Sequence, residues 1–422
     1  MMYQSNIYEY LETLKVAKLL ICKDDKEAFQ IRDVAALLGF EAYVLPDIRA
    51  SLGEDLRTFD EEIHTFLSTL SAYHRSTSKK LLISPLRTIL IPFPNPELLG
   101  QKTIEFGDKI DLQTLKNTLY HWGYHFTDIA ASKGEVSIRG DIIDIFPIDA
   151  NKPYRIGLFD DEVETIQYYD EATQKRIMPK EGEDELDHVT FTPAFLSLEQ
   201  EAYEALTQRV EKSKFDCFVK DIDALGLWCL EELGSSALGQ FEGVFASAIQ
   251  AELEEVYALT LPLVARETLE LAVIPSSKRY RDLEVVDPNK LLEQHKDKKI
   301  TIIARNESIV RGSHLESFEG IEFVYQEGIV NILGADRLIL SLNKPLKRKK
   351  VKKASIILDE LKPGDYVVHE NHGVGIFKGI EKREVLGATS EFVVMSYQNG
   401  DLLLIPVSSL EVIDRFVADS GT

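Results

Sequence analysis

The sequence predicts a multidomain protein that combines α/β and α+β domains. Short apolar runs alternate with helical patterns in the first hundred residues, and strand patterns separated by turn residues dominate residues 106–195. A dense all-β segment follows residue 357. A chain of 422 residues is also too long to be organised around one hydrophobic core.

Residues 1–105 predict the first part of an α/β domain. Apolar runs at 18–22, 41–45 and 80–84 have the length of buried strands, and helical patterns lie between them. Strands that alternate with helices form a parallel sheet covered on both faces. The prolines of 91-IPFPNPELL-99 end this pattern.

Residues 106–195 predict an inserted α+β module. A helix over 112–126 with a terminal Gly123 precedes four strand patterns, which are 135–140, 141–147, 154–160 and 162–170. Residues 196–265 return to helical patterns and are assigned to the second part of the first domain. Residues 266–343 predict a small α/β domain, with strands at 299–305, 321–325 and 337–342.

Residues 344–356 form a basic linker that contains 344-KPLKRKKVKK-353. A solvated, flexible connection is the favoured interpretation of this run, and contact with nucleic acid is the alternative. Residues 357–420 predict a small SH3-like β-barrel. Within it, Asn399-Gly400-Asp401 between two strand patterns is a hairpin signal.

The composition indicates a cytoplasmic protein with protein partners. The net charge of -22 disfavours nucleic-acid binding over the whole surface and suits contact with basic patches of other proteins. The three cysteines have no metal-ligand spacing, and no apolar run approaches the ~20 residues of a membrane helix. We therefore expect no membrane association.

No catalytic, cofactor or metal residue is predicted. The phosphate-binding pattern GxxxxGK[ST] is absent, as are GxGxxG, GxSxG and HExxH. His369-Glu370-Asn371-His372 is interpreted as turn chemistry before Gly373. We therefore expect this chain to have no enzyme activity and no cofactor of its own.

Two long stretches resemble a known family. Residues 119–149, 154–175 and 189–195 resemble the module shared by bacterial transcription-repair coupling factors and the excision-repair protein UvrB. Residues 361–416 resemble the family's RNA-polymerase-interaction domain, which is akin to CarD-type transcription regulators.

The resemblance implies a degenerate UvrB-like, helicase-like first domain and two partners, UvrA and the RNA polymerase β subunit. It also implies that the translocase of the family, with its ATP, Mg²⁺ and most of its DNA contacts, lies outside this chain. The chain is then the N-terminal scaffold of a coupling factor. The alternatives are a UvrB-like subunit that processes DNA damage and a CarD-like transcription regulator.

The resemblance also implies UvrA-binding candidates. In UvrB, arginines on the equivalent strand bind UvrA, and Arg139 falls on the last of them. Guanidinium suits this role because it stays charged and presents a planar fork to carboxylates. Ser137 and Phe126 stand where UvrB has its other arginines, and Lys133 is the second basic candidate.

The strand pattern 391-EFVVMSYQ-398 supplies the polymerase-binding candidates. Phe392 and Val394 point to one face, and Val393 and Met395 point to the other. We expect this strand to be an edge that pairs with the polymerase, with Val393 and Met395 as anchors and Glu391 at the rim. If Val393 instead lies in the core, Phe392 and Val394 face the partner. The remaining alternative is that this chain covers both faces.

Overall fold

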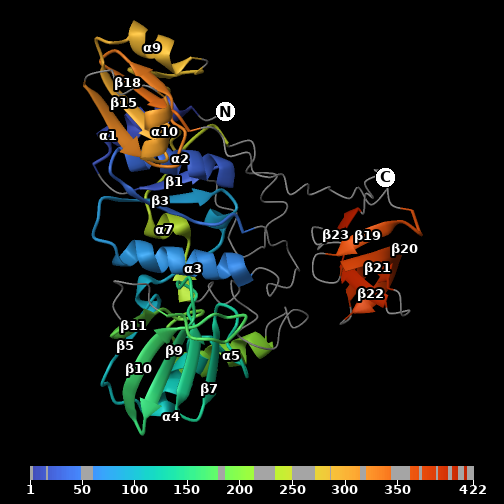
Figure 1. The fold of residues 1–422 in the computed structure, drawn as a ribbon. Coiled ribbons are helices and arrows are strands. Elements are labelled where there is room, and N and C mark those ends of the chain that lie inside the picture. The colour runs from blue at the N-terminus through green and yellow to red at the C-terminus, as the bar shows by residue number, and fades with distance from the viewer. Residues whose placement is uncertain are drawn as a thin grey trace. The chain divides into compact units, whose positions relative to one another are not determined.

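The computed structural model describes residues 3–15, 18–48, 60–178, 186–212, 233–249, 271–285, 287–313, 320–343, 362–369, 373–385, 388–397, 402–406 and 413–415. The chain divides into two compact units, Met1–Lys344 and Pro345–Thr422 (Figure 1). None of the described helices is both long enough and apolar enough to cross a membrane.

The first sheet of the larger unit is parallel, as predicted. Its strands are β1 (Leu19–Cys22), β2 (Glu41–Val44), β3 (Lys80–Pro85) and β13 (Gly243–Phe245), in the order β13-β1-β3-β2. The helices α1 (Gln4–Thr13) and α2 (Asp25–Leu37) cover one face, and α3 (Asp60–Arg75) and α7 (Ala237–Gln240) lie on the other (Figure 1). Because β13 comes from far along the sequence, the chain returns to this sheet after the inserted module.

The inserted module is built on a second, five-stranded sheet of order β10-β9-β8-β7-β6. Its strands are β6 (His125–Phe126), β7 (Glu135–Arg139), β8 (Ile142–Phe146), β9 (Tyr154–Phe159) and β10 (Glu162–Tyr168). The pair β5 (Lys102–Glu105) and β11 (His188–Phe191) and the helices α4 (Leu112–His121) and α5 (Gln200–Lys212) complete it. The remaining short elements are η2 (Thr88–Leu90), β4 (Phe93–Pro94), η3 (Pro96–Leu98) and β12 (Gly234–Ser235), of which β4 and β12 pair antiparallel.

The helix predicted over 112–126 ends at His121 instead. Gly123 has φ +80°, a left-handed conformation that stops a helix and that side chains rarely adopt. A Cβ at this position would also lie 2.7 Å from the Cβ of Phe195. The chain therefore turns here, and the buried Tyr124 donates its hydroxyl to the carbonyl oxygen of Thr192 (2.7 Å).

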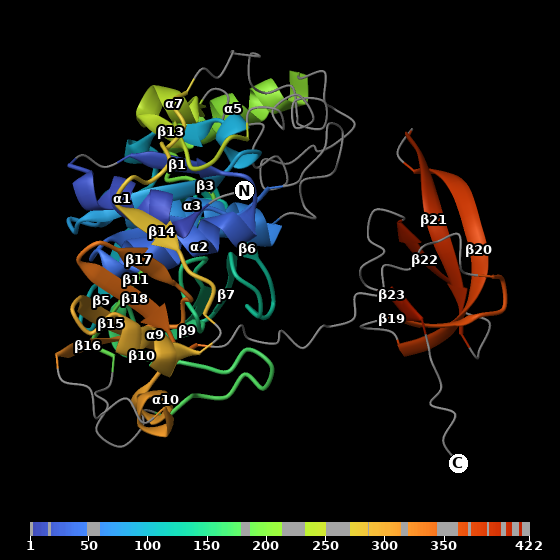
Figure 2. The same ribbon diagram turned by 90° about the horizontal axis from the view of Figure 1, so that it is seen from above.

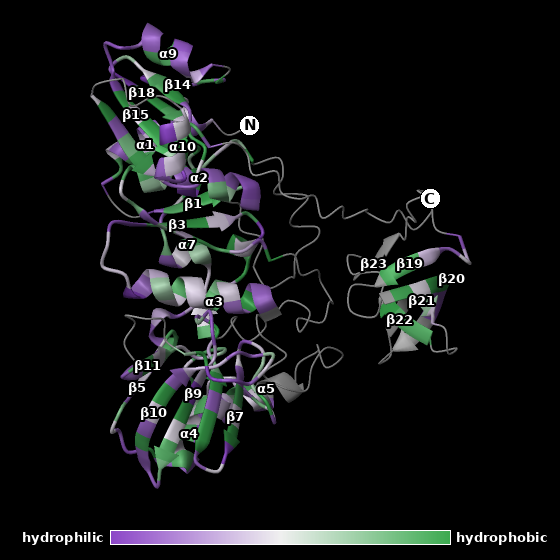
Figure 3. Ribbon diagram, viewed as in Figure 1, coloured by the Kyte–Doolittle hydropathy of each residue, from purple (hydrophilic) through white to green (hydrophobic). Residues whose placement is uncertain are grey.

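A mixed sheet of order β14-β17-β18-β15-β16 forms the small α/β domain. Its strands are β14 (Tyr280–Asp282), β15 (Lys299–Ala304), β16 (Ile321–Tyr325), β17 (Ile332–Gly334) and β18 (Arg337–Ser341). The helices α9 (Pro288–Gln294) and α10 (Glu307–Gly312) accompany it, and α9 is largely hydrophilic (Figure 3). One hydrophobic core joins this sheet to α1, α2 and the first sheet, and it includes Ile7, Leu20, Ile303 and Ile339.

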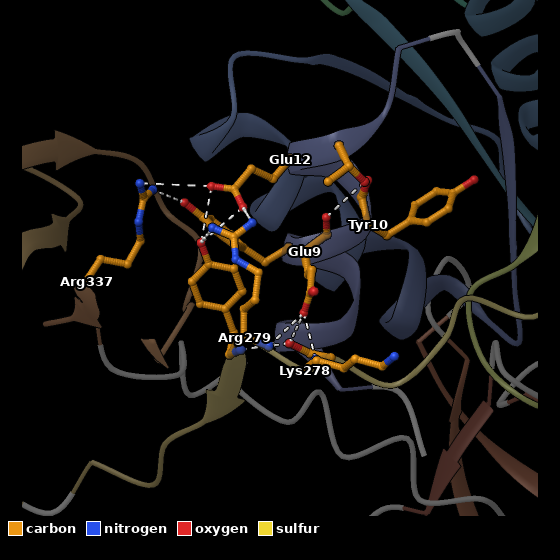
Figure 4. A network of polar contacts seen from close by, with 10 residues as sticks. Glu9, Tyr10, Glu12, Lys278, Arg279 and Arg337 are labelled. Atoms are coloured by element: carbon orange, nitrogen blue, oxygen red, sulfur yellow. Dashed lines mark hydrogen bonds and ion pairs between the residues drawn. The ribbon is translucent and has the colours of Figure 1, made fainter. Parts of the chain in front are cut away.

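Polar contacts also hold α1 against the small domain (Figure 4). The Glu9 carboxylate accepts hydrogen bonds from the Ser277 hydroxyl (2.5 Å) and from the backbone nitrogens of Lys278 (2.8 Å) and Arg279 (3.1 Å). Glu12 forms an ion pair with Arg279 at 2.8 Å and accepts a hydrogen bond from the Tyr280 hydroxyl at 3.0 Å. The first helix of the chain is therefore also a structural element of the small domain.

The smaller unit is an antiparallel sheet of order β22-β21-β20-β19-β23 (Figure 2). Its strands are β19 (Tyr366–His369), β20 (Gly373–Val385), β21 (Ala388–Ser396), β22 (Leu402–Pro406) and β23 (Ile413–Arg415). β21 and β22 pair antiparallel on either side of the predicted hairpin turn. The turn itself and the basic run 344–353 lie outside the described residues.

Candidate partner-binding sites

Arg139 lies in a cluster of three charged residues on one face of the module's sheet. Its Nη2 is 2.8 Å from Oδ2 of Asp144 on the neighbouring strand β8. Arg155, on β9, donates to both oxygens of the same carboxylate, from Nε at 2.6 Å and from Nη2 at 2.8 Å. Asp144 therefore accepts charge-assisted hydrogen bonds from two arginines.

The three residues differ in exposure. The Asp144 side chain is fully buried, whereas 52% of the Arg139 side chain is exposed. Arg155 stacks over the Tyr169 ring, with its Cζ 4.8 Å from the ring centroid, and its hydrogen bonds to Asp144 raise its pKa. Two guanidinium groups and one carboxylate leave one surplus positive charge, and Arg139 presents it to solvent.

Ser137 lies on the same face but is only 1% exposed. Its hydroxyl donates to the carbonyl oxygen of Asp128 at 2.9 Å, while the Tyr169 hydroxyl donates to that of Ala130 at 2.5 Å. The segment that precedes β7 therefore crosses this face of the sheet and covers Ser137. Ser137 is therefore buried beneath this segment and holds it through its hydroxyl.

Lys133 is exposed, and its ammonium donates to the carbonyl oxygen of Ile148 at 3.1 Å. The neighbouring Gly134 has φ +83°, and a Cβ there would lie 3.1 Å from Cε1 of His64 on α3. Lys133 thus sits where the module meets the first domain. Phe126 is 44% exposed, but its register places it beside Val136 and not beside Arg139.

Two apolar residues share the face and the sheet end of Arg139. Ile142 is the cross-strand partner of Arg139, and Phe159 lies two residues beyond Gly157, the partner of Ile142. Ile142 and Phe159 are 41% and 69% exposed. We call Arg139, Ile142 and Phe159 the Arg139 patch. Sequence reasoning missed the two apolar residues, although their strand periodicity places them on the polar face.

In the smaller unit, the structure corrects the expected position of the strand 391–398. β21 pairs with β20 on one side and with β22 on the other. It is therefore a central strand, and the strand order places β22, not β21, at the edge. Over Phe392–Ser396 the strand is paired on both sides, so this stretch has no backbone groups left for pairing with another protein.

The expected orientation of this strand is also reversed. Val393 and Met395 are fully buried and pack with Val367, Phe377 and Ile405 in the core of the unit. The expectation that Val393 and Met395 are exposed anchors is therefore wrong, because no surface of either side chain is accessible. The opposite face carries the partly exposed Phe392, the buried Val394 and, on β22, Leu402 at 58% exposure. Glu391 lies on β21, outside the residues whose side chains the structure describes.

Among the described residues, no group of histidine, cysteine, aspartate and glutamate side chains could hold a metal ion. The buried Cys22 thiol donates to the carbonyl oxygen of Ser84 at 3.3 Å. Burial raises its pKa well above the usual range, so the thiol stays protonated and unreactive.

Comparison with protein families identifies two domains in this chain. Residues 103–195 match the UvrB interaction domain, and residues 361–417 match the CarD-like/TRCF RID domain. The first match covers the strand that carries Arg139, and the second covers all the strands of the antiparallel sheet in the smaller unit. The chain is thus a multidomain protein that joins a UvrB-type interaction domain to a CarD-like domain.

Curated relatives cover the full length of the chain. It is 33% identical over 429 residues to the transcription-repair-coupling factor of Helicobacter pylori J99, a match that includes 100% of this chain and 42% of the relative. The factors of Haemophilus influenzae (22% identical, 99% of this chain, 44% of the relative) and Staphylococcus haemolyticus (24%, 81% and 38%) are also similar. The chain is similar along its whole length to these transcription-repair coupling factors of Helicobacter pylori. It spans about two fifths of the length of the curated relatives it matches.

Proposed function

We propose that this chain is a scaffold that joins stalled RNA polymerase to UvrA in transcription-coupled nucleotide excision repair. The smaller unit binds the polymerase β subunit, and the module at 103–195 recruits UvrA. The observation that carries this proposal is the presence of both interaction domains in one chain. A CarD-like regulator or a UvrB-like subunit accounts for only one of the two.

The Arg139 patch is the proposed UvrA-binding surface. An exposed guanidinium flanked by two exposed apolar side chains can bind a carboxylate while its neighbours exclude water, an arrangement common at interface hot spots. Lys133 precedes the opposite end of β7 and is a separate candidate contact, and Ser137 holds the segment that covers the middle of this face.

The proposed polymerase-binding surface is the face of the smaller unit that carries the partly exposed Phe392 and the exposed Leu402, with Val394 buried on the same face. Leu402 begins the edge strand β22, whose outer backbone groups can add a strand from the partner. The core residues Val393 and Met395 hold this face in shape.

We extend the proposal to the whole protein by family resemblance. There, an ATP- and Mg²⁺-dependent translocase makes most of the DNA contacts, and the protein works in the cytoplasm. The chain described here contributes the partner-binding surfaces and no catalytic step.

The test is retention of UvrA on immobilised RNA polymerase. Without this chain we expect UvrA not to be retained on the polymerase. With it, we expect the chain and UvrA to be retained together. Arg139→Ala should weaken UvrA binding about tenfold and leave polymerase binding unchanged, because it removes one exposed anchor. Leu402→Asp should prevent retention of both.

Arg311→Ala is the matched control, because Arg311 is also a surface arginine, with a side chain 67% exposed on α10 of the small domain. It should behave as the wild type in both interactions. Equal UvrA retention by Arg139→Ala and the wild type would show that the Arg139 patch is ordinary surface. Failure of the unaltered chain to bind polymerase would refute the scaffold itself.

A further inference from the structure

The Arg139–Asp144 contact is not needed to stabilise the buried carboxylate. A buried carboxylate requires a charged partner, because burial in a low-dielectric interior penalises an unpaired charge. Arg155 already supplies this partner through two hydrogen bonds of 2.6 and 2.8 Å. Ion pairs with half-exposed side chains generally add little to folding stability. A role for Asp144 in holding Arg139 accounts for the third hydrogen bond.

The geometry of the contact fixes the direction of the Arg139 side chain. The cross-strand partner of Asp144 is Ser137, so Arg139 reaches it diagonally along the sheet. A two-residue turn, in which Gly140 has φ +57°, holds the backbone beside Arg139. One Nη of the guanidinium is thereby anchored to a buried group, while 52% of the side chain remains exposed.

Arg155 fixes the carboxylate in turn. Its own guanidinium also donates to the carbonyl oxygen of Gln174 at 3.2 Å and stacks on Tyr169. Rotation of Asp144 would therefore break its two hydrogen bonds to a guanidinium that is itself held in place. We propose that Asp144, held by Arg155, is a positioning residue that pre-orients Arg139 for a carboxylate on UvrA. Holding a long side chain in its bound orientation reduces the entropy lost on association.

This inference rests on the proposed UvrA-binding function and is tested separately from it. The experiment measures the affinity of the full chain for UvrA in a double-mutant cycle of Asp144→Asn and Arg139→Ala. If Asp144 acts through Arg139, Asp144→Asn should weaken binding about fivefold in the wild-type background and less than about twofold in the Arg139→Ala background.

A purely structural role gives a different result. If Asp144 only maintains the fold of the module, its substitution should weaken binding by the same factor in both backgrounds, and this outcome would overturn the inference. Unchanged affinity of Asp144→Asn in the wild-type background would also overturn it. If the unaltered chain does not bind UvrA at all, the proposed function fails instead.

Asp144→Glu covers the case in which Asp144→Asn does not fold. It keeps the negative charge that Arg155 requires but moves the carboxylate by one methylene group, which changes the orientation of Arg139. Asp144→Glu should weaken UvrA binding more in the wild-type background than in the Arg139→Ala background. An equal loss of affinity in both backgrounds counts against a positioning role. Hydrogen exchange of the strands β7–β9 confirms that each variant retains the sheet.

Discussion

The Glu27 carboxylate accepts a hydrogen bond from the backbone nitrogen of Lys23, with 2.6 Å between Oε2 and the nitrogen. Asp24, the N-cap of α2, accepts one from the backbone nitrogen of Glu27 at 2.9 Å. This helix start follows β1 of the parallel sheet, the position at which many α/β proteins bind phosphate through backbone N–H groups. In this chain the carboxylates of Glu27 and Asp24 occupy two backbone N–H groups at this position.

We therefore predict that the isolated chain does not bind ATP tightly. The two carboxylates repel a phosphate and use the backbone donors that it needs, and the sequence has no phosphate-loop lysine. Calorimetric titration with ATP and Mg²⁺ should give no saturable binding in the micromolar range. Stoichiometric uptake at micromolar affinity would contradict the prediction.

Val393→Asp should unfold the smaller unit. The substitution buries a carboxylate in a core in which the described residues offer no cation, at a cost of about 3 kcal/mol or more, and small domains have little stability to spare. Hydrogen exchange should be fast throughout residues 366–406 of the variant. Leu402→Asp is the control, since Leu402 is 58% exposed and its substitution should leave exchange in β20 and β21 slow.

The packing of α3 against the module should weaken in acid. Burial lowers the pKa of His64 to about 4, so in the folded state it stays neutral, while the unfolded chain binds a proton below about 6.5. The stabilisation is complete above pH 6.5 and decreases as the pH falls from 6.5 towards 4. The melting temperature should therefore fall more between pH 7 and pH 5 in the wild type than in His64→Gln. Identical pH profiles would rule out His64 as the source.

Glu9→Ala should loosen β14 from α1. The carboxylate accepts three hydrogen bonds from residues 277–279, and these interactions lower its pKa. Amide exchange in residues 278–282 should become faster, while exchange in the distant sheet of the module should not change. Because the pKa of Glu9 is lowered in the folded state, this stabilisation persists at neutral pH and is lost as the pH falls through the folded-state pKa. Unchanged exchange at β14 would indicate that the apolar core alone holds α1.

Much of the architecture was predictable from local sequence patterns. The alternation of apolar runs and helical patterns identified β1, β2 and β3 as parallel strands, and the strand patterns from 135 to 168 identified β7–β10. Periodicity and turn residues carry this information because each depends on neighbouring residues only. Gly123 was recognised as a helix terminator, although the helix ends two residues before it.

The contacts between distant segments were not predictable in this way. No local pattern indicates that α1 packs on a sheet formed by residues 280–341, or that Arg139 shares the carboxylate of Asp144 with Arg155. Such contacts depend on which strands become neighbours and in which register, and a one-residue shift in register would exchange the two faces of the sheet.

The sequence by itself indicated the helix and strand patterns, the resemblance to the coupling factors and Arg139 as the candidate anchor. The tertiary structure decided that Ser137 and Val393 are buried, that β21 is a central strand, and that Ile142 and Phe159 flank Arg139. The alternation of side chains along a strand shows that two faces differ. Which face is covered depends on the segments that fold over the sheet, and these come from distant parts of the chain.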